Sequence, residues 1–418
     1  MKRVAAVLAV FLSASLAAQG PSAGGAVDQA SAALDEGKFL KASDMLAAAA
    51  FDRNGKVKDD FAFQIWRQVS PMVTGELDRA TLDRAQPLRS ADPGMLKRIA
   101  RSTSRDAIAE IVRRARDTSI VILNEAHDSP RDRAFALQVA RALRPLGYSV
   151  LAAEAFDNER AHGSRLTAIE QLRRDGFVRI GTGFYTRDPV YAAFVRGALK
   201  AGYRPVAYEQ TSDQTPPDNG HEGHGGIGPR EQAQAENLAA IHIRSPSAKM
   251  LIYVGYSHVA EAAVDLDAGK MEWMAVRLKR LTGIDPLTID QASLTDVSAD
   301  LRSVHDRAAA RVGSRPSVLF DSNRPLMLGS YAGAVDLEVV HPRRAFRYGR
   351  PSWLALLGGT PRSVPAHLLP ATGRRLVQVF AASAPRDAIP LDQLLVRAGT
   401  RPGKLMVPPG PVRYAVQP

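Results

Sequence analysis

Four short apolar stretches of this chain are each followed directly by residues that can carry out acid–base or metal chemistry. The stretches are 119–123, 149–153, 204–208 and 249–254. The ionisable residues at their ends are Glu125, His127, Glu154, Glu209 and His258. Imidazole and carboxylate groups together suit Zn²⁺, Mn²⁺ or Fe, and such an ion lowers the pKa of a bound water until it supplies hydroxide near neutral pH. A metal-free alternative uses a histidine as general base, with a glutamate that orients its ring.

The elements expected to position these residues alternate between strands and helices. The stretch 119–123 is apolar throughout, which is typical of a strand buried on both faces. Helical patterns at 131–144 and 231–243 lie between the apolar stretches, and this βαβ spacing predicts an α/β fold with a mostly parallel sheet and flanking helices. Ligands bind at the carboxyl ends of parallel strands. We therefore expect the two histidines and three glutamates to converge on one edge of the sheet, whereas any one of them alone would more often be a solvated residue.

Two short motifs resemble those of a known superfamily. The segments NEAH (124–127) and GYSH (255–258) resemble the paired G-x-x-H motifs of the Tiki/TraB superfamily, which also includes erythromycin esterase-like proteins and the ChaN haem-binding lipoproteins. The stretch 124–156 resembles their opening strand–helix–strand unit with a glutamate on the second strand. In the segment 229–231, Arg230 resembles the arginine that precedes their last βα unit. The resemblance covers roughly residues 100–290.

The resemblance implies a hydrolytic or cofactor-binding pocket. In Tiki-like members the motif histidines and glutamates are associated with divalent-metal-dependent peptide cleavage, in esterase-like members a corresponding histidine acts as general base toward water, and ChaN-like members bind haem. Two features depart from the pattern. Asn124 replaces the usual first glycine, which matters little if this residue serves only the backbone turn, and the chain has no cysteine for a lipid anchor.

In the metal-dependent interpretation, a divalent ion (Zn, Mn or Fe) is held by the two motif histidines. His127 and His258 are the expected ligands, with Glu125 or Glu154 as the third. The remaining glutamate would then be the general base, and Glu209 would support the ligands without contacting the ion.

In the metal-free interpretation, the same residues take other roles. His258 or His127 deprotonates water and a glutamate orients the ring. In both interpretations Arg230 stabilises the negative charge that develops in the transition state. If the protein instead binds haem, Tyr256 is the candidate axial ligand.

The N-terminus predicts export. Residues 1–3 are basic, 4–12 are apolar and 13–18 are small, which is the pattern of a cleavable signal peptide. We therefore expect a periplasmic or secreted protein, with no transmembrane segment after cleavage. The absence of cysteine excludes disulfides and thiolate catalysis. The net charge of +12 is spread along the chain without a basic run interleaved with aromatics, so nucleic-acid binding is not indicated.

The expected organisation has four parts. They are a signal peptide at 1–18, a helical N-terminal region at 26–95, an α/β domain at 100–300 and a β-rich C-terminal region at 312–418. The leading hypothesis is an exported hydrolase-like protein that acts on a small-molecule or peptide substrate. The alternatives are a haem- or iron-binding protein without catalysis, and an envelope interaction protein with a vestigial site. The histidine-containing stretch 221–226 is interpreted as a loop over the pocket, and the sequence gives no oligomeric state.

Overall fold

The computed structural model describes residues 23–86, 88–159, 165–215, 227–266 and 269–418. The expected signal peptide and the stretch 221–226 lie outside these residues. No helix in the described part of the chain is long and apolar enough to cross a membrane.

The core is a nine-stranded sheet with the order β1-β9-β11-β8-β2-β5-β3-β4, in which β10 adds to β9. The six strands from β11 to β4 are mutually parallel, and the antiparallel pairs of this sheet are those of β9 with β1, β10 and β11. The expectation of a mostly parallel sheet is therefore confirmed. The strands are β1 (Thr103–Asp106), β2 (Ile120–Glu125), β3 (Tyr148–Ala153), β4 (Arg204–Val206), β5 (Lys249–Gly255), β8 (Leu287–Asp290), β9 (Ser317–Asp321), β10 (Arg324–Pro325) and β11 (Leu337–Val340).

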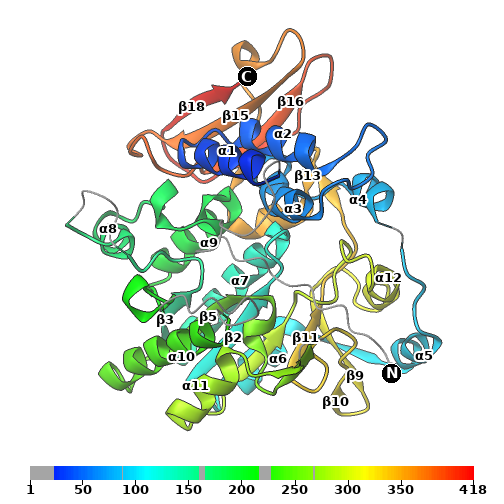
Figure 1. Ribbon diagram of the computed structural model, residues 1–418, viewed down its shortest axis with the longest axis vertical. Coiled ribbons are helices and arrows are strands. Elements are labelled where there is room, and N and C mark those ends of the chain that lie inside the picture. The colour runs from blue at the N-terminus through cyan, green and yellow to red at the C-terminus, as the bar shows by residue number, and fades with distance from the viewer. Residues whose placement is uncertain (1–22, 87, 160–164, 216–226, 267–268) are drawn as a thin grey trace.

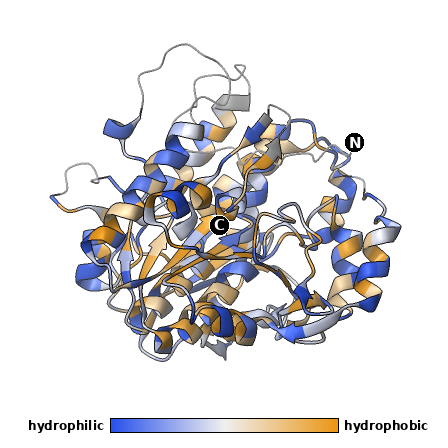
Figure 2. Ribbon diagram, turned by 90° about the horizontal axis from the view of Figure 1, so that it is seen from below, coloured by the Kyte–Doolittle hydropathy of each residue, from blue (hydrophilic) through white to orange (hydrophobic). Residues whose placement is uncertain are grey.

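Helices cover both faces of the sheet, which explains why the central strands are apolar on both sides. Leu123 of β2 packs in one core with Leu137 of α7, and Ile122 of β2 packs in a second core with Leu238 of α10. Figure 2 shows hydrophobic residues concentrated along the strands in the middle of the molecule. The helices of this part are α6 (Ala107–Arg114), α7 (Pro130–Leu143), α8 (Ala168–Asp175), α9 (Pro189–Lys200), α10 (Ile227–Arg244), α11 (Met274–Thr282) and α12 (Arg302–Ala309).

The N-terminal region is helical, as expected. Its helices are α1 (Ala23–Asp35), α2 (Phe39–Ala50), α3 (Asp60–Thr74), α4 (Arg79–Ala85) and α5 (Pro93–Arg101). Helix α3 contains Pro71 in its last turn, continues to Thr74 and ends at Gly75, which adopts a left-handed conformation with φ 85°. One proline near the C-terminus of a helix removes a single N–H, so the helix continues past it.

The C-terminal region is rich in strands and packs against the N-terminal helices at one end of the molecule (Figure 1). Its main sheet has the antiparallel order β16-β15-β18, and Leu40 N of α2 donates to Gln417 Oε1 of β18 at 3.0 Å. The sheet strands are β15 (Arg374–Ala381), β16 (Asp392–Arg397) and β18 (Val412–Gln417).

Three short two-stranded ribbons complete the described strands. In the α/β part, β6 (Val264–Leu266) pairs with β7 (Gly269–Met271). In the C-terminal region, β12 (Phe346–Arg347) pairs with β13 (Arg350–Pro351), and β14 (Thr360–Arg362) pairs with β17 (Leu405–Val407).

Three local predictions differ from the structure. The third predicted strand, 204–208, is shorter, because β4 ends at Val206. The helix predicted to begin at Glu231 already includes Ile227, so Arg230 lies within its first turns. Strand β8 was not predicted. Its four buried residues are too few to give a clear periodic pattern.

Candidate active site at the carboxyl ends of the strands

The sheet brings the predicted site residues to one edge. Strands β2, β5, β3 and β4 are neighbours, and Glu125 pairs with Gly255 in the β2–β5 register. The six residues assigned to catalysis from the sequence all lie at this edge: Glu125, His127, Glu154, Glu209, Arg230 and His258. All are buried except Glu209, which is partly exposed. In space β5 lies between β2 and β3, so the two motif segments are direct neighbours.

His127 is oriented by a buried ion pair. Its Nδ1 lies 3.0 Å from Oε1 of Glu125, and Arg133 donates to both oxygens of that carboxylate at 2.9 and 3.0 Å. Burial by itself would raise the pKa of Glu125, but Arg133 and the His127 hydrogen bond lower it below its ordinary value. An ionised carboxylate only accepts, so Nδ1 of His127 carries the proton and Nε2 presents its lone pair.

Aromatic rings and a glycine hold the His127 ring in place. Tyr185 stacks on it with centroids 3.8 Å apart, and Tyr256 contacts it edge-on at 5.0 Å. A Cβ on Gly255 would lie 2.5 Å from Nε2 of His127 and 3.2 Å from Oε2 of Glu154. Among the described residues no hydrogen bond reaches Nε2, and it is not one of the enclosed polar atoms without a partner. This nitrogen is therefore not fully enclosed, although only 3% of the surface of His127 is exposed.

Replacing Gly255 with Ala is expected to displace the His127 ring, because the added methyl group would overlap it. We expect kcat to fall about 10²-fold, the usual cost of misplacing a reacting group by about 1 Å. The free energy of unfolding should fall by about 1–3 kcal/mol from overpacking. Steady-state kinetics and urea unfolding measure both effects. Gly181→Ala, where a Cβ meets no atom, is the control, and unchanged kinetics in Gly255→Ala would contradict the described position of His127.

His258 has a different environment from His127. Its Nδ1 lies 2.9 Å from Oε2 of Glu231, and its Nε2 lies 3.3 Å from Oε1 of Glu154. Burial would lower the pKa of His258, but the carboxylates of Glu154 and Glu231 raise it to about 10. The ring is therefore a cation at neutral pH and is unsuited to act as a base. Burial opposes ionisation of Glu154, yet the charge of His258 and that of Arg230 hold its pKa well below the ordinary value.

Arg230 joins two of the predicted glutamates. Its Nη2 donates to Oε1 of Glu154 at 2.9 Å, and its Nε donates to Oε1 of Glu209 at 2.9 Å. Gln234 also donates to both oxygens of Glu209, at 3.1 and 3.2 Å. In this arrangement Arg230 positions the carboxylates of Glu154 and Glu209, and its expected role toward a transition-state charge stays a prediction.

The predicted metal ligands do not fit a metal ion in this arrangement. Both oxygens of Glu125 accept hydrogen bonds from Arg133. Those of Glu154 accept from Arg230 and from the backbone N–H of Gly255. Within the described ranges no group of three histidine or acidic side chains is arranged to hold a metal. The guanidinium groups of Arg133 and Arg230 already bind the carboxylate oxygens that a metal ion would need as ligands. No step of the proposed mechanism therefore uses a metal.

Tyr256 was the residue predicted to bind haem. It has a positive φ of 36°, and its ring packs against His127. Its observed ring contact is with His127, and it does not line the cavity of about 500 Å³ beside β4 or the one of about 20 Å³ beside Asp128.

Several residues that complete the site were missed or undervalued in the sequence. They are Arg133, Asp188, Glu231 and Tyr185, and from the N-terminal helix α3, Arg67 and Gln68. Arg67 Nε donates to Asp128 Oδ2 at 2.8 Å, and the Tyr185 hydroxyl donates to Gln68 Oε1 at 3.2 Å. The motif-like stretch 229–231 could have indicated a role for Glu231 in the site. Nothing in the sequence of α3 indicates a role for Arg67 or Gln68, because their partners in the site are distant in sequence.

Asn124 matters more than the sequence analysis expected. Its side-chain Nδ2 donates to Asp290 Oδ1 at 2.8 Å and to the carbonyl of Tyr256 at 3.0 Å, and its Oδ1 accepts from Gln291 N at 2.8 Å. These bonds tie β2 to β8 and fix the backbone of the second motif. Glu338 of β11 lies opposite Asp290 in the register.

Glu338 predicts how stability depends on pH. Burial, helped by the Asp290 carboxylate, raises its pKa from 4.5 to about 8. The folded protein therefore keeps this proton where the unfolded chain releases it. The resulting stability is complete below the unfolded pKa and is lost as pH rises toward 8, at about 1.4 kcal/mol per unit.

Glu338→Gln, which cannot ionise, should match wild type in the free energy of unfolding near about pH 5 and exceed it near about pH 9. Urea denaturation at the two pH values measures this difference. Glu236→Gln, at an exposed position, is the control. Parallel pH dependence in Glu338→Gln and wild type would show that Glu338 ionises normally.

Comparison with known proteins gives a partial structural likeness. No protein-family model and no curated protein matches this chain. One similar solved structure is RRSP, a MARTX toxin effector domain from Vibrio vulnificus CMCP6, with 15% identity over 68% of this chain and a TM-score of 0.33. Another is the C-terminal region of Pasteurella multocida toxin, described as having a thiol-protease-like catalytic triad, with 14% identity over 55% of this chain and a TM-score of 0.30. The chain spans 50% and 31% of these two proteins, and it has no cysteine.

The fold and site together define an α/β protein with a buried glutamate, histidine and arginine cluster at the carboxyl edge of a mostly parallel sheet.

Proposed function

We propose that this protein is an exported, metal-independent hydrolase in which His127 is the general base. The observation that carries the proposal is the Glu125–His127 pair, in which Glu125 fixes the proton on Nδ1 and leaves Nε2, which lies against Gly255, without a hydrogen bond from the described residues. This is the arrangement that a histidine needs to deprotonate water. The resemblance to erythromycin esterase-like sequences, where a histidine has this role, supports the same choice.

The proposed reaction is the hydrolysis of an ester or peptide bond. Nε2 of His127 takes a proton from water, and the oxygen of that water attacks the carbonyl carbon. Glu125, held by Arg133, stabilises the imidazolium that forms. The same proton then passes from His127 to the leaving group as the carbon–oxygen or carbon–nitrogen bond breaks. His258, already a cation, keeps Glu154 ionised and in place next to Gly255.

A substrate panel tests this function on the purified mature protein. Chromogenic esters and fluorogenic peptides should be hydrolysed with a rate that rises with pH, because a general base acts in its deprotonated form. Activity should survive prolonged treatment with EDTA, and elemental analysis should find no stoichiometric metal. Loss of activity on chelation, restored by zinc or manganese, would replace the proposal with the metal-dependent mechanism. A Soret band in the purified protein would favour haem binding.

A further inference from the structure

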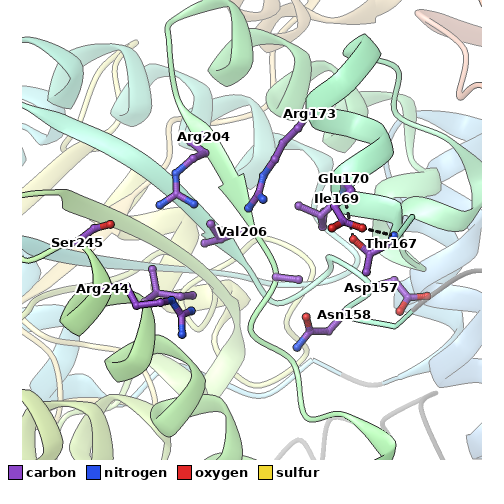
Figure 3. Close-up of a pocket in the computed structure, with 12 residues that line it drawn as sticks. Asp157, Asn158, Thr167, Ile169, Glu170, Arg173, Arg204, Val206, Arg244 and Ser245 are labelled. Atoms are coloured by element: carbon purple, nitrogen blue, oxygen red, sulfur yellow. Dashed lines mark hydrogen bonds between the residues drawn. The ribbon is translucent and has the colours of Figure 1, made fainter. Parts of the chain in front are cut away.

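A cavity of about 500 Å³ lies beside the edge strand β4, between α8 and the C-terminal end of α10 (Figure 3). One end of it is lined by Asp157 and Asn158, just past the carboxyl end of β3. Asn158 Nδ2 donates to the backbone carbonyl of Glu209 at 2.8 Å. The cavity therefore adjoins the candidate active site, because the backbone segments that line or contact it here also carry Glu154 and Glu209.

Three arginines from three different elements line this cavity. They are Arg173 of α8, Arg204 of β4 and Arg244 of α10. Figure 3 shows Arg173 and Arg204 extending toward the space around Val206, with Arg244 on the other side of it. Burial lowers the pKa of Arg173 and the neighbouring charge of Arg204 lowers it further, while the carboxylate of Glu170 only partly opposes them. Such repulsion is relieved when an anion lies between the two groups.

The acidic residues in the cavity wall are engaged in local turns. Glu170 Oε2 accepts from Thr167 N at 2.7 Å in the capping box of α8, and Asp157 Oδ1 accepts from Glu159 N at 2.8 Å. Among the described residues, no ion pair within 4.0 Å joins Arg173, Arg204 or Arg244 to a carboxylate. With three cationic and two acidic side chains the lining has an excess of positive charge.

The geometry points to an anion subsite: we propose that this cavity binds the phosphate or carboxylate group of a ligand. Guanidinium groups match the planar oxygen pairs of these anions. An extended peptide added to the edge of β4 is a poorer occupant. Pro205 has no N–H to donate, and its carbonyl already accepts from Nε and Nη2 of Arg173 at 2.9 and 2.6 Å. If the proposed function holds, the substrate is an ester or amide that carries an anionic group.

Calorimetric titration of the full mature chain with inorganic phosphate, and separately with succinate, tests the subsite without any need for turnover. Arg204→Gln with Arg244→Gln should weaken binding about ten-fold or more, because two charge-assisted hydrogen bonds to the anion are lost. Arg324→Gln with Arg401→Gln removes the same charge from exposed positions elsewhere and should not change binding. Tighter binding of phosphate or of succinate identifies the group. Absence of saturable binding of both anions, or equal binding by the two double variants, would overturn the inference.

A kinetic comparison links the subsite to the active site. With paired esters that share a leaving group, the Arg204→Gln/Arg244→Gln variant should raise KM about ten-fold for the anionic ester and leave KM for the neutral ester and kcat unchanged. If anions bind but no ester or peptide is hydrolysed, the proposed function fails and the subsite stands. If esters are hydrolysed but the variant does not alter discrimination between the pair, the subsite does not serve the substrate.

Discussion

Replacing His127 with Asn is expected to lower kcat for ester or peptide hydrolysis by about 10²–10⁴-fold, the usual contribution of a general base. Asn lacks a nitrogen that can accept a proton, whereas its size lets it stay between Tyr185 and Tyr256. KM should change little, because the residue acts on water. Steady-state kinetics on the best substrate of the panel measure the two constants separately.

Two variants make this result interpretable. His367→Asn, at an exposed position, should keep full activity and controls for the substitution itself. His258→Asn removes the buried cation beside Glu154 and should reduce activity without shifting the ascending limb of the pH–rate profile, because His258 is already protonated at neutral pH. If the pH limb disappears in His258→Asn and persists in His127→Asn, the general base is His258 and the assignment is wrong.

Replacing Arg133 with Met is expected to lower the free energy of unfolding by about 3–5 kcal/mol, the cost of breaking a buried ion pair from one side. Arg133 is completely buried, and its Nη1 also donates to Asp188 Oδ2 at 2.6 Å. Without the guanidinium, the carboxylates of Glu125 and Asp188 are left buried without their cation. Urea unfolding followed by circular dichroism measures the loss.

A double variant separates charge from packing in this triad. Adding Glu125→Gln to Arg133→Met removes one stranded charge and should recover part of the lost stability, although activity should stay low because Gln no longer stabilises the imidazolium. Arg113→Met breaks the ion pair with Glu110 from a largely exposed side chain and should cost at most about 1 kcal/mol. A cost that small in Arg133→Met would contradict the buried triad.

The sequence by itself determined which residues reach the candidate site from the ends of strands. Glu125, Glu154 and His258 each follow an apolar run, and such runs are typical of strands buried on both faces. Parallel strands place their carboxyl ends at one edge, so the convergence of these residues follows from local pattern and topology together. The same local signals gave the helical N-terminal region and the strand-rich C-terminal region.

Only the tertiary structure decided what those residues can do. A pattern of histidine and glutamate is the same for a metal site and for a base–carboxylate pair. The difference depends on which groups reach the lone pairs: Arg133 covers Glu125, Arg230 covers Glu154, and Glu231 contacts Nδ1 of His258. These contacts join residues of separate elements, and no local periodicity encodes them.

The physical reason is that local sequence sets backbone conformation, whereas protonation and ligand availability depend on burial and on charges brought close through space. His127 and His258 occupy equivalent places in two similar motifs. The structure leaves Nε2 of His127 without a hydrogen bond from the described residues and encloses His258 between two carboxylates, so that one is suited to be a base and the other is a fixed cation.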